Sequence, residues 1–326
     1  MKNLRRLSSF VKSNTAPTDD QFNLIKSRLL NTEWHTQEDA LSPSPARQIF
    51  VTLQSLLGGS HTPFIDLDSS KSLDKGKTAT VDSLLKKGLP LPPGYTLAYC
   101  NPLSDERYLG SDGYDNYHAP VLNNMEFFKR RMWVNGSFTF NNENPLTFGD
   151  PIFFKETMNS VRFLRRSKMI FTDYNREFSN QNGLSVKESR GLCYIEDVYK
   201  FRSSKGYFQH DTPDEEIVVT PSILTNFRMS AITFNSHQIH YNPSYAKFAE
   251  NYEDTVIEAP LLISLALQFW CSKNPKQNIN RFKYKITMPT YVNRPLSIKY
   301  KRSGRFVKLW ISNESSLTCF DSTIEL

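Results

Sequence analysis

The sequence has few cysteines and no arrangement of them that would support a disulfide framework. Only four occur in 326 residues: Cys100, Cys193, Cys271 and Cys319. None belongs to a Cys-x-x-Cys pair, and cysteine and histidine do not group at the spacing of structural zinc sites. The chain is therefore expected to fold in a reducing compartment without disulfides or a structural metal.

Long hydrophobic runs are missing as well. The longest, from Ala259 to Trp270, contains Ser264 and Gln268 and falls short of the ~20 apolar residues that span a bilayer, so no membrane insertion is expected. Glycine (13) and proline (18) are ordinary in number, which excludes collagen-like and low-complexity chains. A content of 39% hydrophobic and 22% charged residues indicates a globular chain with one large domain or two ordinary ones.

Acidic side chains are absent from residues 1–18. Apolar residues there repeat on one helical face among several serines, a composition typical of a mitochondrial transit peptide. We therefore expect import into the mitochondrial matrix, the alternative being a frayed basic N-terminus of a cytosolic protein. The basic side chains of the segment are Lys2, Arg5, Arg6 and Lys12.

Helical segments followed by β-rich segments occur twice along the chain. A capping box from Thr18 to Gln21 opens one predicted helix, and a second begins at Ser44-Pro45 and ends at Gly58-Gly59, before a polar loop over residues 60–80. The predicted strands are Met132–Phe140, Ile152–Phe163, Met169–Phe178 and Leu192–Val198, then Phe282–Met288, Leu296–Tyr300, Phe306–Ile311 and Leu317–Ile324. This layout predicts an α+β fold of two similar antiparallel units, over residues 32–200 and 210–326.

The segment Pro260–Trp270 is apolar on almost every side. A helix without a polar face must be covered on nearly all sides, as a sheet curved around it would do. Pro260 suits the first helical position, so Ala259 lies where free N–H groups and the positive end of the helix dipole point outward. Such a helix start can stabilise an oxyanion.

Residues 233–243 concentrate polar chemistry in one short stretch, Thr-Phe-Asn-Ser-His-Gln-Ile-His-Tyr-Asn-Pro. Its two histidines, His237 and His240, have no Asp, Glu or Cys paired with them locally, so a metal site is not expected. General acid and base catalysis suits a histidine near a helix start better.

These motifs together resemble a known family. The stretch from Thr233 to Pro243, followed by Val256-Ile-Glu-Ala259-Pro260, looks like the hydratase motif of MaoC-like, hot-dog-fold dehydratases. Upstream segments at 91–95, 130–136 and 145–150 are similar to the two-hot-dog branch. The resemblance is closest to the type 2 hydroxyacyl-thioester dehydratases of fungal mitochondria, and it runs from about Trp34 to the C-terminus.

The resemblance implies a double hot-dog fold in which each half wraps an antiparallel sheet around a central helix. The first half would shape an acyl tunnel and the second would carry the catalytic residues. The implied reaction is the reversible dehydration of an (R)-3-hydroxyacyl thioester to a trans-2-enoyl thioester in mitochondrial fatty acid synthesis, without a cofactor. Acyl carrier protein is the natural carrier there, and coenzyme A is the alternative.

The reaction assigns a role to each candidate residue. His240 is expected to act as acid and base, Ala259 N–H to bind the thioester oxygen, and Asn235 to hold the hydroxyl or water. Many relatives have Asp in place of Asn235 and Gly in place of Ala259; an amide cannot be a base, so His240 would carry most of the proton transfer. His237 would either orient His240 or the water, or satisfy a loop carbonyl.

Nine basic side chains lie in the last β region, and the net charge of the chain is +7. They form either a solvated sheet face or a landing site for an acidic carrier protein or its phosphopantetheine. No RNA-binding signature accompanies them, so no nucleic-acid partner is expected. They are Arg281, Lys283, Lys285, Arg294, Lys299, Lys301, Arg302, Arg305 and Lys308.

Other functions stay open from the sequence. A hot-dog protein that binds acyl thioesters without chemistry is the non-enzymatic alternative, supported by the Asn235 departure. A coenzyme A-dependent enoyl hydratase and a hot-dog thioesterase are enzymatic alternatives, which differ from the dehydratase in carrier and product. A homodimer is possible, and the sequence does not choose between it and a monomer.

Overall fold

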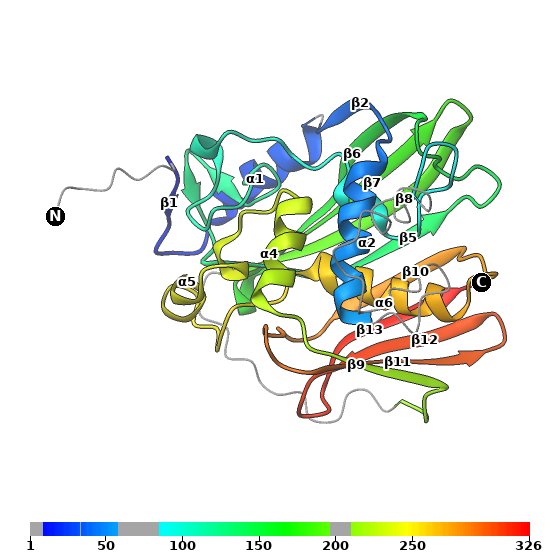
Figure 1. Ribbon diagram of the computed structural model, residues 1–326. Coiled ribbons are helices and arrows are strands. Elements are labelled where there is room, and N and C mark those ends of the chain that lie inside the picture. Colours follow the sequence, from blue (N-terminus) through cyan, green and yellow to red (C-terminus); the bar gives the residue numbers. More distant parts are fainter. Residues whose placement is uncertain (1–8, 33, 58–84, 196–209) are drawn as a thin grey trace.

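The computed structural model describes residues 9–32, 34–57, 85–195 and 210–326 (Figure 1). The predicted polar loop at 60–80 and the Gly58-Gly59 helix end lie outside the described residues. The helices are α1 (Asp19–Asn31), α2 (Pro43–Leu57), α4 (Ile223–Ile232), α5 (Pro243–Phe248) and α6 (Ala259–Lys273), with short 3-10 turns η2 (Tyr95–Ala98), η3 (Glu106–Tyr108), η4 (Arg165–Ser167) and η5 (Gln238–His240).

Within the described residues, ten strands form one continuous sheet in which all neighbours are antiparallel. In spatial order they are β2 (Thr36–Ala40), β6 (Pro151–Leu164), β7 (Met169–Asn180), β8 (Gly183–Ile195), β5 (Arg130–Phe140), β10 (Arg281–Ile286), β13 (Thr318–Glu325), β12 (Phe306–Ser312), β11 (Leu296–Ser303) and β9 (Glu215–Val219). The first five come from the first half of the chain and the last five from the second. The two predicted units are thus fused through the β5–β10 pair, where the Trp133 indole donates to the Tyr284 hydroxyl at 2.9 Å.

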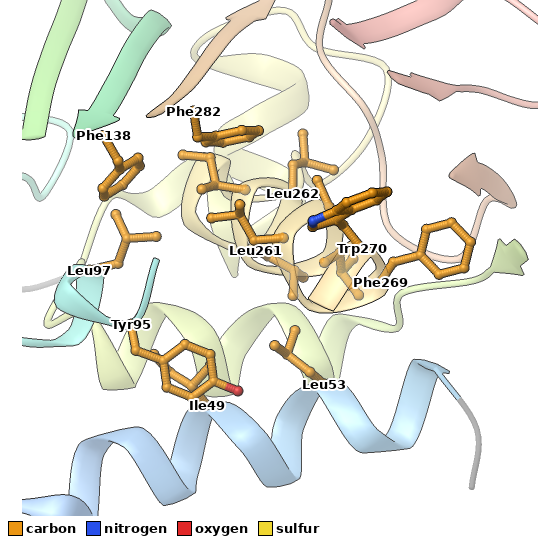
Figure 2. Close-up of a cluster of buried hydrophobic side chains, with 14 of the residues drawn as sticks. Ile49, Leu53, Tyr95, Leu97, Phe138, Leu261, Leu262, Phe269, Trp270 and Phe282 are labelled. Carbon is orange, nitrogen blue, oxygen red and sulfur yellow. The ribbon is translucent and has the colours of Figure 1, made fainter. Parts of the chain in front are cut away.

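Each half of the sheet packs on a long helix. Helix α6 is buried on nearly all sides, as its sequence predicts, among side chains of the second-half strands such as Phe282. Helix α2 buries one face, including Ile49 and Leu53, and shares a single apolar core with α6 and first-half strand residues such as Phe138. Figure 2 shows Ile49 and Leu53 on one side of α6 and Phe138 and Phe282 on the other. The predicted α+β double hot-dog arrangement is confirmed.

Local predictions hold at α1 and fail in part at β8. Thr18 and Gln21 form the predicted capping box of α1. The strand predicted at Leu192–Val198 begins nine residues earlier, at Gly183, directly after the turn. Its first part reads as polar because it contains Glu188 and Arg190, yet both are buried in an ion-pair cluster with Arg176. The charged residues Glu188 and Arg190 therefore made the first part of β8 look like a loop in the sequence.

The end of the predicted transit segment belongs to the folded body. Strand β1 (Val11–Lys12) pairs in parallel with β4 (Met125–Glu126), which pairs in turn with β3 (Val121–Leu122). The Val11 N–H donates to the Asn124 carbonyl at 3.0 Å. Among the described residues, no helix is both long and apolar enough to cross a membrane.

Candidate active site

A cavity of about 300 Å³ lies between the two halves, and all four sequence-predicted site residues line it: Asn235, His237, His240 and Ala259. The first half supplies mostly apolar walls from β5, β7 and β8, and the second half supplies most of the polar groups. Apolar lining from the first half includes Met132, Trp133, Met169, Phe171, Leu192 and Cys193. The cavity can therefore hold a short apolar chain with its reactive end at the second half.

His240 is held as a neutral imidazole. Its Nδ1 lies 2.9 Å from the carbonyl oxygen of Val256, which can only accept, so Nδ1 carries the proton and Nε2 keeps its lone pair. Burial, and secondarily the neighbouring His237, lowers the pKa of His240 to about 3. The ring thus presents a base of fixed tautomer to the cavity.

Asn226 of α4 fixes the two segments that carry the site. Its amide nitrogen donates to the carbonyls of His240 at 2.8 Å and Val256 at 3.0 Å, and its oxygen accepts the N–H of Glu258 at 2.9 Å. The side chain is fully buried, so these bonds are not exchanged with water. Asn226 therefore sets the distance between the start of α6 and the loop over residues 233–242, which carries the candidate catalytic histidines and is named the catalytic loop.

Glu258 stands immediately before α6 and also lines the cavity. Its Oε1 accepts from the Thr233 hydroxyl at 2.7 Å and from the Asn235 amide at 2.8 Å. Burial raises the pKa of this carboxyl to about 7, against the hydrogen bonds that favour its ionised form. Beside His240, the site therefore contains a carboxyl group whose pKa suits proton exchange near neutral pH.

Ala259 supplies the first N–H of α6. A first-turn N–H has no partner within its own helix, and the dipole of a 15-residue helix adds positive potential there. Because Ala259 lines the cavity, this helix start faces the space that a substrate would fill. The arrangement fits the predicted oxyanion site.

The His237 ring lies close to two carboxylates, those of Asp112 in the first half and Glu250 after α5. Its Nε2 is 3.2 Å from Glu250 Oε1 and 3.7 Å from Asp112 Oδ2, and its ring lies edge-on to His240 with centroids 5.5 Å apart. The donor atoms of the three residues are close enough for a metal ion, but Arg131 already donates to both oxygens of Asp112. We interpret the group as a buried ion-pair cluster behind the catalytic loop.

The loop over residues 110–116 of the first half supports the catalytic loop directly. The Ser236 hydroxyl donates to the Gly113 carbonyl, and the Gln238 N–H donates to the Asp112 carbonyl at 3.0 Å. Gly113 has a φ of +87°, and a Cβ there would lie 2.6 Å from the Ser236 carbonyl oxygen. The first half therefore contributes to the placement of His237 and His240 as well as to the cavity wall.

Sequence analysis missed Glu258, Asn226, Asp112 and Glu250. Glu258 is visible as an acidic residue before a helix-starting proline, which by itself indicates only a favourable dipole contact. Its contacts with the end of α4 and with the loop of Asn235 bury it, and no local pattern reveals them. Asn226 sits within a helix and carries no sequence signal for its role.

The fold defines a class of protein. A solved MaoC-like dehydratase from Phytophthora capsici superimposes with a TM-score of 0.63, covering 92% of this chain and 97% of that chain at 11% sequence identity. The chain thus has the fold of the MaoC-like proteins, with the site at the junction of its two halves.

Sequence relationships give the family. The model of the family described as hydroxyacyl-thioester dehydratase type 2 matches residues 94–292. A Schizosaccharomyces pombe protein named mitochondrial hydroxyacyl-thioester dehydratase type 2 is 30% identical over 68% of this chain and 80% of its own length. A mesaconyl-C(4)-CoA hydratase of Chloroflexus aurantiacus is 24% identical over 73% of this chain and 84% of its length. This chain belongs to the hydroxyacyl-thioester dehydratase type 2 family, as its motifs predict.

Proposed function

We propose that this chain is a mitochondrial hydro-lyase that dehydrates (R)-3-hydroxyacyl thioesters to trans-2-enoyl thioesters in fatty acid synthesis. The observation that carries the proposal is the pairing of a neutral His240 imidazole with the open start of α6 in one mostly apolar cavity. Family membership and the mitochondrial name of the fission yeast relative support it. The basic segment at residues 1–18 supports location in the matrix.

The residues supply what elimination of water needs. The Ala259 N–H stabilises negative charge on the thioester oxygen while His240 Nε2 takes the proton from C2. Asn235 and its neighbours hold the 3-hydroxyl end of the substrate near the loop. The apolar walls from β5, β7 and β8 receive the acyl chain. This supports the proposal that residues 32–200 form the tunnel half and residues 210–326 the catalytic half.

We further propose acyl carrier protein as the carrier. Five of the nine basic side chains already pair with acidic neighbours: Arg294, Lys299, Lys301, Arg305 and Lys308. Arg281, Lys283 and Lys285 are exposed on β10 and form no ion pair with another described residue. Strand β10 leads into Ile286 and Thr287 of the cavity wall, so an acidic carrier docked on it would deliver its arm to the site.

The proposal is tested by following hydration of a short trans-2-enoyl thioester, on carrier protein and on coenzyme A, with chiral analysis of the product. We expect (R)-3-hydroxy product from wild type, a rate lower by about 10²- to 10⁴-fold for a folded His240→Ala, and little change for His35→Ala outside the cavity. Hydrolysis of the thioester would indicate a thioesterase. A folded wild-type protein that yields neither the hydrated nor the hydrolysed product would support the alternative of a hot-dog protein that binds acyl thioesters without catalysis.

The import signal is expected to end before Val11. Cleavage after residue 18 would remove β1 and its bonds to Asn124 and Glu126, together with the Thr18 cap of α1. N-terminal sequencing of the protein from mitochondria checks this. A mature chain that starts beyond Ser13 would show that β1 is dispensable.

A further inference from the structure

Glu258 is a buried carboxylic acid in the wall of the cavity. It is the only carboxylic acid among the described residues that line the cavity, and it is 1% exposed. It forms no ion pair with another described residue, and the lowering of its pKa by Arg190 is outweighed by burial, which raises the pKa. The Thr233 hydroxyl at the end of α4 and the Asn235 amide of the catalytic loop both donate to its Oε1.

We propose that Glu258 is a second catalytic acid and base, which protonates the leaving 3-hydroxyl while His240 takes the C2 proton. The inference rests on the proposed function and deepens it, since it replaces a single-histidine scheme by a two-group scheme. It also explains how the chain works with an amide at position 235: Asn235 orients the carboxyl that does the chemistry instead of supplying one.

The step balances with these two groups alone. His240 Nε2 accepts the proton from C2, the C2–H electron pair forms the C2–C3 double bond, and the C3–O bond breaks. Its electron pair leaves with the hydroxyl oxygen, which takes the proton of the Glu258 carboxylic acid and departs as water. Glu258 is then a carboxylate and His240 an imidazolium, and transfer of one proton from His240 to Glu258 restores the starting state.

Negative charge on the thioester oxygen favours the protonated Glu258 carboxyl during catalysis. The thioester oxygen gains negative charge at Ala259, the residue that follows Glu258 in the chain. An ionised Glu258 there would oppose that charge, whereas a neutral carboxylic acid does not. The same group becomes an anion only as the oxygen loses its charge and the carbon–oxygen bond breaks.

The expected pH dependence of kcat/KM follows from the one proton that His240 and Glu258 share. Burial raises the pKa of Glu258 to about 7, while burial and then His237 lower the pKa of His240 to about 3. Both directions of the reaction use the enzyme with one proton on the pair, so kcat/KM falls as the pH rises through about 7. Charged or titratable groups that act on Glu258 are Arg190 of β8, which lowers its pKa, and Tyr114 of the 110–116 loop.

The variants Glu258→Gln and Glu258→Asp test the role, with Glu253→Gln as a matched exposed control. We expect Glu258→Gln to lose about 10²-fold or more in kcat and to lose the alkaline limb, Glu258→Asp to keep the limb with partial activity, and Glu253→Gln to match wild type. Circular dichroism and thermal unfolding establish that each variant is folded.

Two results would overturn the inference. The first is a Glu258→Gln protein that keeps its rate within about threefold and keeps the alkaline limb while wild type turns over, which leaves the proposed function intact. The second is an infrared difference spectrum, wild type minus Glu258→Gln, that shows an ionised carboxylate well below about pH 7. That spectrum needs no turnover, so it judges Glu258 even if wild type proves inactive and the proposed function fails.

Discussion

The amide of Asn235 donates to the Glu258 carboxyl at 2.8 Å, and its oxygen accepts the backbone N–H of His237 at 3.0 Å. Both ends of this side chain are thus used inside the protein. Asn235 is a positioning residue in this geometry: it holds Glu258 against the catalytic loop and shapes the loop that carries His237. A carboxylate at position 235 could not donate the first of these bonds.

Asn235→Asp should therefore alter the pH dependence rather than restore a missing base. Two carboxyl groups would then face each other in a buried site, which raises the pKa of the group that stays protonated. We expect the alkaline limb of kcat/KM to move to a higher pH than in wild type, with loss of stability at alkaline pH. Rate profiles and urea unfolding of Asn235→Asp and Asn235→Ala measure this. An unshifted limb would mean that residue 235 does not contact the titrating group.

Asn226→Ala should damage the site without touching substrate. It removes three buried hydrogen bonds, to the carbonyls of His240 and Val256 and from the N–H of Glu258. At about 1 kcal/mol each, the free energy of unfolding should fall by about 3 kcal/mol, with a large loss in kcat. The exposed Asn159→Ala provides the control and should change stability by less than about 0.5 kcal/mol. Equal stability of the two variants in urea would contradict the proposed role of Asn226.

Glu258 should also govern stability as a function of pH. Its pKa rises from the ordinary 4.5 to about 7 on folding, so the folded state binds the proton more tightly than the unfolded state. The resulting stabilisation is complete below 4.5 and is lost as the pH rises through about 7, by about 3 kcal/mol in all. Subtracting the unfolding free energy of Glu258→Gln from that of wild type at each pH isolates this contribution. A flat difference across the range would show that Glu258 is ionised in the folded protein.

Local sequence patterns predicted much of the fold and half of the site. The capping box at Thr18, the all-round apolar segment of α6 and the alternation in β10 each depend on neighbouring residues, and all were found as expected. The catalytic motif placed Asn235, His237 and His240 in one loop, since they are close in sequence.

The rest depends on contacts between distant segments. Asp112 reaches His237 across 125 positions of sequence, and Glu258 is buried only because α4 and the catalytic loop close over it. The polar start of β8 was missed because Glu188 and Arg190 look solvent-exposed in sequence but neutralise each other in the interior. Hydrophobic periodicity does not identify buried ionisable side chains, which is why the start of β8 and the role proposed for Glu258 were both missed.

Comparing Gly113→Ala with Gly183→Ala should distinguish a loss of kcat caused by displacement of the catalytic loop from a loss of stability caused by backbone strain. Gly113 and Gly183 both have left-handed backbone, with φ of +87° and +105°, so alanine at either site should cost about 1 kcal/mol of stability. Only at Gly113 would the new Cβ meet a neighbour, the Ser236 carbonyl oxygen at 2.6 Å, whereas nothing lies within 4 Å at Gly183. Gly113→Ala is therefore expected to push the loop that holds His237 and His240 and to lower kcat about 10-fold or more, while Gly183→Ala keeps wild-type turnover. Matched thermal unfolding and hydration assays decide it, because equal kcat for the two variants would show that the first half does not position the catalytic loop.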